Sequence, residues 1–401
     1  MPLSLYLHIP FCSTRCSYCD FNTYAGIEDR IPAYVDALLA EVRAVAAGLR
    51  GAEAPTEVHT IFFGGGTPSL LPSVSLRALM AALRQEFEVA PDVEVTLEAN
   101  PGTVTARRLE SLARLGVNRL SLGGQSASPA ELALLGRTHS FADVVQSVRA
   151  ARDAGFANIN VDWILGLPHQ TLASWLTTLD RAIELRTEHL SVYSLSLEYG
   201  TPMRAWVMRG LVSAPDPDRG ADMYEATAER LREAGFVQYE ISNWARSRLG
   251  ARPDLPVEEA TFACRHNLQY WRNRPYLGFG AGAHGSALGW RYSNVLSPDG
   301  YVRAVARLQA SRPPMGPAVA TTVPSSPSDS MSETMFLGLR LTGEGVGADG
   351  FSRRFGRSMD AVYGAELRRL AGEGLIEWAP DRVRLTARGR LLGNRVFEAF
   401  V

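Results

Sequence analysis

The chain has 401 residues and a formal net charge of −1, because 41 basic side chains stand against 42 acidic ones. This length exceeds one small core and predicts a large domain followed by a smaller one. The balanced charge gives no bulk attraction to nucleic acid or to an anionic membrane. The sequence contains no cationic, apolar leader and no uncharged apolar run of membrane-spanning length, so we expect a cytoplasmic protein with reduced thiols.

The first predicted element is a strand over residues 3–9, where every second residue is apolar until Pro10 ends the pattern. The loop that follows holds Cys12, Cys16 and Cys19, three of the four cysteines in the chain. Thiolates are soft ligands, and such tight clustering favours an iron–sulfur cluster or zinc over a disulfide. A structural zinc site normally has four protein ligands, and no fourth cysteine lies nearby. We therefore favour a four-iron cluster with one open iron over zinc and over three unrelated thiols.

The segment from Tyr6 to Phe21 resembles the radical S-adenosylmethionine (SAM) enzymes, whose signature is this Cys-x3-Cys-x2-Cys spacing. The resemblance implies that the three cysteines hold a [4Fe-4S] cluster. It also implies that the open iron is chelated by the amino and carboxylate groups of SAM. An electron from the cluster would then break the sulfonium C–S bond and release a 5′-deoxyadenosyl radical.

Strand-like and helix-like patterns then alternate along the first half of the chain. The expected strands cover residues 3–9, 58–63, 93–98, 119–122, 159–164 and 190–197, and amphipathic helices are expected over 33–49, 75–87, 105–115, 141–154 and 171–185. Repeated βα units predict a parallel sheet with right-handed crossovers. Six units predict an α/β fold, a partial (βα)6 TIM-like barrel of the kind typical of radical SAM enzymes, with a doubly wound sheet as the alternative.

The alternation fades after the sixth strand, which suggests a division into parts. We expect the radical SAM partial barrel over 1–200, an extension of the barrel over 201–312, a Pro- and Ser-rich linker over 313–330, and a C-terminal winged-helix-like domain over 331–401. Winged helices often bind DNA, but the arginines of this last domain are largely matched by Asp and Glu. It therefore lacks the basic stripe of a DNA reader, and we favour a packing or docking module.

Further candidate ligands lie at the carboxyl ends of the predicted strands, where barrels of parallel strands carry their chemistry. The run Gly64-Gly65-Gly66-Thr67-Pro68 follows the second strand and matches neither phosphate-binding glycine motif, so a tight turn is its alternative reading. Glu98 ends the third strand, Gln125 follows the fourth, Arg137 lies downstream of it, and Asp162 lies in the fifth. Such groups suit the cationic, hydroxyl and carboxylate parts of SAM, although single charged residues are more often surface salt bridges or caps.

Together these motifs resemble one branch of the radical SAM superfamily, which contains the oxygen-independent coproporphyrinogen III dehydrogenases and the heme chaperones called HemW. The resemblance runs through nearly the whole chain, including residues 198–202, 239–244 and 385–389. It implies a SAM site made of Tyr6, Tyr18, Gly65, Gly66, Thr67, Glu98, Gln125, Arg137 and Asp162.

Two features favour the chaperones within this branch. The dehydrogenases carry a fourth cysteine two residues beyond the third, where this chain has Phe21. Residues 266–271, His-Asn-Leu-Gln-Tyr-Trp, match a stretch typical of the chaperones and imply that His266 contacts heme. From the residues alone a structural histidine is the favoured interpretation of His266, and only the resemblance brings heme contact level with it. Cys264 is either an alternative thiolate ligand or a small buried hydrophobe, and we favour the latter.

The expected function is therefore that of a [4Fe-4S]- and SAM-binding protein that binds heme and hands it to acceptor heme proteins, such as respiratory proteins at the membrane. No catalytic residue is assigned, nucleic acid is not an expected partner, and a homodimer is left open. The alternatives are radical oxidative decarboxylation of coproporphyrinogen III, radical chemistry on another small molecule, and a non-catalytic DNA-binding regulator.

Overall fold

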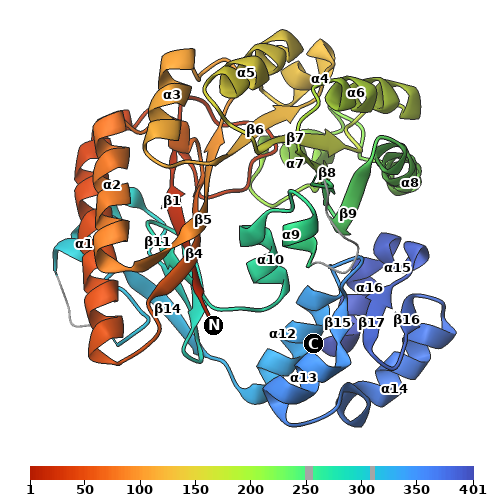
Figure 1. Ribbon diagram of the computed structural model, residues 1–401. Coiled ribbons are helices and arrows are strands. Elements are labelled where there is room, and N and C mark those ends of the chain that lie inside the picture. Colours follow the sequence, from red (N-terminus) through yellow and green to blue (C-terminus); the bar gives the residue numbers. More distant parts are fainter. Residues whose placement is uncertain (249–255, 308–311) are drawn as a thin grey trace.

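A computed structural model describes residues 1–248, 256–307 and 312–401. Its centre is a run of six parallel strands that pair in the order of the sequence (Figure 1): β1 (Leu3–Ile9), β4 (Glu57–Gly65), β5 (Glu88–Ala99), β6 (Arg119–Gln125), β7 (Ile159–Leu165) and β8 (His189–Ser194). The helices that connect or follow these strands include α1 (Ile31–Gly51), α2 (Ser73–Glu86), α3 (Ala106–Arg114), α4 (Pro129–Leu134), α5 (Phe141–Asp153), α6 (Leu172–Glu184), α7 (Pro202–Met208) and α8 (Pro217–Glu233).

The predicted α/β fold, a partial (βα)6 barrel, is confirmed, because each neighbouring pair of these six strands runs parallel. The observed strands and helices overlap the predicted ones, although the sixth strand ends at Ser194 and not at residue 197. Local sequence fixes several helix starts. At α5, Ser140 and Asp143 form a capping box that satisfies backbone N–H groups of the first turn.

Alternation along the strands separates an apolar outer face from a polar inner face. In β5 the side chains of Val93, Val95, Leu97 and Ala99 belong to the main hydrophobic core. The intervening residues of the same strand therefore point to the opposite, inner face of the barrel, where they include Glu94 and Glu98. The inner face is thus the place where buried polar groups collect.

The chain after β8 extends this sheet at both edges and fills the inside of its curve. One edge gains β9 (Phe236–Glu240) and β10 (Asn243–Arg246), and the other gains β11 (Tyr276–Phe279), β12 (His284–Ala287), β13 (Trp290–Asn294) and β14 (Val319–Pro324). Two further short strands, β2 (Phe11–Cys12) and β3 (Tyr24–Ala25), pair with each other. The helices of this region are α9 (Val257–Ala260), α10 (Arg265–Trp271) and α11 (Pro298–Ala306).

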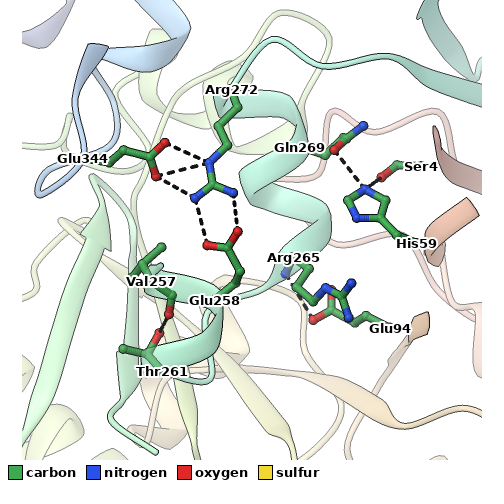
Figure 2. Close-up of polar contacts among 10 residues, drawn as sticks. All are labelled: Ser4, His59, Glu94, Val257, Glu258, Thr261, Arg265, Gln269, Arg272 and Glu344. Atoms are coloured by element: carbon green, nitrogen blue, oxygen red, sulfur yellow. Dashed lines mark hydrogen bonds and ion pairs between the residues drawn. The ribbon is translucent and has the colours of Figure 1, made fainter. Parts of the chain in front are cut away.

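Helix α10 lies inside the curve of the strands, against their amino-terminal halves (Figure 1). The Glu94 carboxylate accepts the backbone N–H of Arg265 (Figure 2) and that of His266, each at 3.1 Å, which places a negative charge at the positive end of the helix. Farther along the helix, Gln269 Oε1 is hydrogen-bonded to His59 Nε2 at 2.9 Å. The helix therefore closes the amino-terminal end of the barrel.

The segment 313–330, which the sequence predicts as a linker, contains β14 and the start of the next helix. β14 pairs antiparallel with β13 at the edge of the large sheet. Its side chains are mostly exposed, so it lacks the alternation of apolar residues that reveals a strand with one buried face. The division of the chain into four domains stays a prediction.

The C-terminal part is a winged-helix-like unit with its own hydrophobic core. Its elements are α12 (Pro327–Gly338), β15 (Val346–Gly347), α13 (Ala348–Phe355), α14 (Met359–Gly372), β16 (Ile376–Trp378), β17 (Arg382–Leu385), α15 (Ala387–Leu391) and α16 (Gly393–Phe397). The three strands form a small sheet in the order β15-β17-β16. Among the described residues, no helix combines the length and the apolar character needed to cross a bilayer.

An arginine at the end of α10 joins the barrel to the C-terminal part. The Arg272 guanidinium lies 2.6 Å from a Glu258 carboxylate oxygen and 2.7 Å from a Glu344 carboxylate oxygen (Figure 2). These paired charges hold the pKa of Arg272 above its ordinary value, against the effect of burial. Because the guanidinium is largely shielded from water, this network is stronger than a surface pair.

Replacing Arg272 by methionine is expected to lower the free energy of unfolding by about 2 kcal/mol, because two half-buried carboxylates lose their partner. Urea denaturation would measure this loss. The matched control is Arg114→Met, which breaks the exposed pair with Glu110 and is expected to change the free energy by less than about 0.5 kcal/mol. Equal, small effects of the two substitutions would show that the Arg272 network does not hold the two parts together.

Candidate functional site

The three clustered cysteines lie on the loop after β1, at the carboxyl end of the barrel. Cys12 is part of β2, which pairs with β3 and so closes the loop that carries Cys16 and Cys19. All three thiols are half-buried and free, whereas Cys264 is fully buried elsewhere. They line a cavity of about 120 Å³ together with the glycine run after β4 and polar residues from the ends of β5, β6 and β7.

Each of the three sulfur atoms has a polar neighbour. Thr67 Oγ1 donates to Cys12 Sγ at 3.7 Å, and Arg137 Nη1 donates to Cys16 Sγ at 3.4 Å. Thr23 Oγ1 lies 3.8 Å from Cys19 Sγ. Burial raises the pKa of the Cys12 and Cys19 thiols, and these hydrogen bonds oppose that rise by stabilising the thiolates.

The donor chemistry of the loop fits an iron–sulfur cluster. Three thiols with a hydrogen-bond partner at each sulfur are the kind of ligand set that Fe–S clusters use. Three thiolates around one zinc ion would instead bring their sulfurs within about 4 Å of one another. Among the described residues, no three His, Cys, Asp or Glu side chains are arranged to hold a single metal ion.

The glycine run is needed because the chain passes very close to the cysteine loop. A side chain at Gly66 would place its Cβ 2.6 Å from the Phe11 carbonyl oxygen and 2.9 Å from Cys12 Sγ. Gly65 has a φ of +113°, a conformation that strongly favours glycine. The N–H groups of Gly66 and Thr67 donate to the carbonyls of Ile9 and Phe11, each at 2.8 Å. The run therefore fastens the cysteine loop to the neighbouring strand.

Two buried carboxyl groups face the same cavity. Glu98 Oε2 accepts the Gly65 N–H at 3.0 Å, and burial, reinforced by the negative charge of Asp162, raises the pKa of Glu98 to about 8. Asp162 accepts hydrogen bonds from Asn160 Nδ2 at 2.7 Å and Ser121 Oγ at 3.4 Å, while burial raises its pKa as well. Two carboxyl groups held partly away from water favour a positively charged ligand beside them.

Arg137 and Gln125 complete the wall of this cavity. Arg137 Nη2 donates to Asn100 Oδ1 at 2.6 Å and to the Gly123 carbonyl at 2.9 Å, which fixes the guanidinium beside Cys16. Gln125 has a φ of +66°, an uncommon conformation for a residue other than glycine. Such local strain is tolerated where the surrounding structure holds a functional side chain in place.

The structure brings eleven of the predicted site residues around this one cavity: Cys12, Cys16, Tyr18, Cys19, Gly65, Gly66, Thr67, Glu98, Gln125, Arg137 and Asp162. Tyr6 does not line it. Its hydroxyl group lies 3.0 Å from His8 Nδ1, and His8 Nε2 lies 2.9 Å from the Asn22 carbonyl oxygen. Tyr6 therefore touches the cysteine loop only through His8.

His266 lies away from the cavity, in the packing between α10 and the strands. Its ring is 1 % exposed, with Nδ1 hydrogen-bonded to Thr60 Oγ1 at 2.8 Å and Nε2 to the Tyr270 hydroxyl group at 2.9 Å. Burial lowers the pKa of His266 to about 3, so the ring is neutral. Both nitrogens are thus engaged, and this arrangement leaves none for a heme iron. The predicted heme contact of His266 is not supported by this geometry and stays a prediction.

A larger cavity of about 330 Å³ continues from the first one into the barrel. The two share seven residues: Tyr18, Cys19, Phe21, Glu98, Ser121, Gln125 and Asp162. The rest of its lining includes the apolar side chains of Phe62, Ile164 and Leu195 and polar side chains of β6, β7 and β8, among them residues that sequence reasoning missed: Arg119, Asn160 and Ser191. Strand periodicity could have identified such residues, since Arg119 lies two residues before Ser121 and hence on the same face of β6.

Comparisons with known proteins agree with this architecture. The family model of the radical SAM superfamily matches residues 6–182, and that of the HemN C-terminal domain matches residues 326–392. The chain is 37% identical over 399 residues to the heme chaperone HemW of Bacillus subtilis, covering 99% of each chain. It is 36% identical over 400 residues to the heme chaperone HemW of Lactococcus lactis, covering 100% of this chain and 97% of the relative.

A solved structure is similar over the same length. The coproporphyrinogen III oxidase HemN from Escherichia coli, described as a radical SAM enzyme, superimposes with a TM-score of 0.80 at 25% identity, covering 100% of this chain and 90% of that one. Full-length identity above one third, the cysteine loop and the C-terminal unit lead to the same assignment. This chain belongs to the radical SAM superfamily and, within it, to the family of the heme chaperone HemW.

Proposed function

We propose that the protein is a [4Fe-4S]- and SAM-binding heme chaperone, which binds heme and transfers it to acceptor heme proteins. The observation that carries the proposal is full-length similarity to proteins named heme chaperone, in a chain whose three clustered thiols open into a polar cavity. The acceptors in this proposal are cytoplasmic or lie at the membrane surface, as respiratory heme proteins do.

In this proposal Cys12, Cys16 and Cys19 hold the [4Fe-4S] cluster, which supplies single-electron chemistry and one open iron for SAM. Thr67 and Arg137 donate hydrogen bonds to two of the ligand sulfurs and so stabilise their negative charge. The Gly65–Thr67 backbone holds the loop against the end of β1. These residues keep the ligand set in place before the cluster is assembled.

The SAM site uses the charged and polar groups around the same cavity. Glu98 and Asp162 suit the ammonium and ribose groups of SAM, and Arg137 suits its carboxylate. Tyr18 and Gln125 line the cavity beside them. The remaining predicted contact, Tyr6, acts as a positioning residue, because it reaches the cysteine loop through His8.

An exposed aromatic residue at the opening of the larger cavity supports a flat, apolar ligand such as heme. Phe21 is 63 % exposed, although it lines both cavities and follows directly on the cysteine motif. Tyr18 lies on the same wall. Aromatic rings left open to water at a cavity mouth gain stability when a flat apolar molecule covers them.

A second candidate function is coproporphyrinogen III dehydrogenation, because the whole chain superimposes on the Escherichia coli oxidase. It is the weaker candidate, since Phe21 stands where the dehydrogenases are expected to have a fourth cysteine. Anaerobic incubation of the reconstituted protein with SAM, a reductant and coproporphyrinogen III tests it directly. Formation of protoporphyrinogen would show dehydrogenase activity and would favour the enzyme over the chaperone as the function.

Replacing Cys16 by alanine is expected to abolish the visible charge-transfer absorbance and most of the bound iron after anaerobic reconstitution, because the cluster loses one of three ligands. The matched control is Cys264→Ala, which removes the one cysteine outside the loop. The control is expected to keep full absorbance and iron content. Retained absorbance in the Cys16 variant would remove this thiol from the ligand set.

SAM affinity is expected to rise with pH between about 6 and 8, by up to roughly tenfold per pH unit, because the raised pKa of Glu98 keeps its carboxyl protonated in the free protein and binding the SAM ammonium releases that proton. Isothermal titration calorimetry in buffers of different ionisation enthalpy would measure both the affinity and the released proton. Glu98→Gln is expected to flatten the profile, whereas the surface variant Glu110→Gln keeps it. A steep profile in Glu98→Gln would assign the released proton to another group.

Heme titration of the reconstituted protein is expected to saturate at about one equivalent, as a dedicated site requires. Phe21→Ala is expected to weaken binding several-fold, because it removes aromatic contact area at the cavity mouth.

His266→Gln is expected to lower thermal stability but to leave the Soret band where it is, since His266 is engaged by Thr60 and Tyr270. A shifted Soret band in that variant would establish His266 as an iron ligand, and loose, unsaturating binding by the wild type would contradict the chaperone.

A further inference from the structure

An arginine without a partner lies in the larger cavity. Arg119 is the first residue of β6 and faces the inside of the barrel, where it is 2 % exposed. Its guanidinium forms no hydrogen bond and no ion pair with any residue that the structure describes, and its Nε is buried without an acceptor. A charged group removed from water without a partner costs several kcal/mol, so most buried arginines are paired.

The carboxylates of Glu94 and Asp162, whose charges act on Arg119, already accept hydrogen bonds from other groups. Glu94 accepts the backbone N–H of Arg265 at the start of α10 (Figure 2). It also accepts the N–H of His266 and the Cys264 thiol. Asp162 is held by Asn160 Nδ2 and Ser121 Oγ. Neither carboxylate forms an ion pair with the guanidinium of Arg119.

These acidic neighbours nevertheless keep Arg119 charged. Burial by itself lowers the pKa of Arg119, but the acidic groups around it, first Cys264 and then Glu94, Tyr239 and Asp162, outweigh that effect and hold the pKa above its ordinary value. The cavity therefore contains a permanent cation whose planar donors are free for an acceptor from outside the protein.

The position of Arg119 defines how a ligand would lie. Gly123, four residues farther along β6, lines the cavity of the cysteine loop. At a rise of about 3.3 Å per residue, Arg119 lies on the order of 13 Å deeper than that point. A ligand whose acidic end reached Arg119 would thus extend upward to the place where the cluster and SAM are proposed to bind.

We propose that Arg119 binds the carboxylate of a ligand that enters the barrel from the side of the cysteine loop. A guanidinium matches a carboxylate with two parallel hydrogen bonds, which makes carboxylate the favoured ligand chemistry. A volume of about 330 Å³ is at the lower end of ligand pockets and admits a small acid or one propionate side chain of a porphyrin. A whole macrocycle would remain at the mouth, beside Phe21. The porphyrin source rests on the proposed function, whereas the small acid does not.

Heme and heme dimethyl ester distinguish a propionate contact from other heme binding. The wild type is expected to prefer heme over the ester by roughly 10- to 100-fold, the value of one charge-assisted contact. Arg119→Gln is expected to lose this preference, while Arg230→Gln, at an exposed pair with Asp180, keeps it. SAM affinity, measured in parallel, is expected to stay the same in all variants. If Arg119→Gln does not fold, Arg119→Lys decides: a reduced preference supports the contact, and an unchanged one overturns it.

Sodium propionate tests the small-acid source in the same variants. If the ligand is a small acid, millimolar propionate raises the thermal unfolding midpoint of the wild type more than equal concentrations of chloride do, and this extra rise disappears in Arg119→Gln. Either dependence on Arg119, with the ester or with propionate, supports the proposal. If neither preference depends on Arg119, the arginine only balances the charges of Glu94 and Asp162, and the proposal is wrong. A wild type that fails to saturate with heme contradicts the chaperone function, and the propionate result still decides the role of Arg119.

Discussion

The candidate site depends on the parallel pairing of β1 with β4. This pairing places the end of one strand, with its cysteine loop, directly beside the glycine run that follows the other. Two backbone hydrogen bonds join them, and the approach is so close that a Cβ at Gly66 would collide with Phe11 and Cys12. The loop is short and irregular, so its conformation is set by this contact and by β2–β3 pairing more than by its own sequence.

The fold compensates only some of the charged groups inside the barrel. Glu94, Glu98, Asp162 and Arg119 all lie on the inner face, where Glu94 and Arg119 are buried and Glu98 and Asp162 are half-buried along the cavity. Glu94 is neutralised by the amino end of α10, and Asp162 by neighbouring amide and hydroxyl groups. Among the described residues, Glu98 accepts one hydrogen bond, from the Gly65 N–H, and Arg119 has no hydrogen-bond or ion-pair partner. Groups in this state lower the stability of the free protein and become favourable when a ligand of opposite charge arrives.

Much of this arrangement could be predicted from the sequence, because it follows from local patterns. Period-two alternation and amphipathic helices locate the barrel, and the cysteine spacing with strand-end polar residues locates the rim. Contacts between distant segments could not be predicted. The His266 imidazole is hydrogen-bonded to Thr60, which lies more than two hundred residues earlier in the chain. No local pattern in the sequence indicates this partner. β14 could not be recognised as a strand from the sequence either, because an exposed edge strand that contains Thr and Pro has the composition of a linker.

Helix α10 connects these observations, since each of its two ends makes a charged contact. Its amino end donates two backbone N–H groups to Glu94, whose carboxylate forms no ion pair with Arg119, and the arginine is buried without an acceptor among the described residues. Its other end carries Arg272, which is paired with Glu344 of the C-terminal unit. Residues 266–271, the stretch that resembles the chaperones, therefore line the floor of the cavity through Asn267 and end one residue before the arginine that contacts the C-terminal unit. A change in α10 that released the Glu94 carboxylate to form an ion pair with Arg119 would neutralise the proposed carboxylate site. The position of this helix therefore determines whether the cavity can receive an acidic ligand.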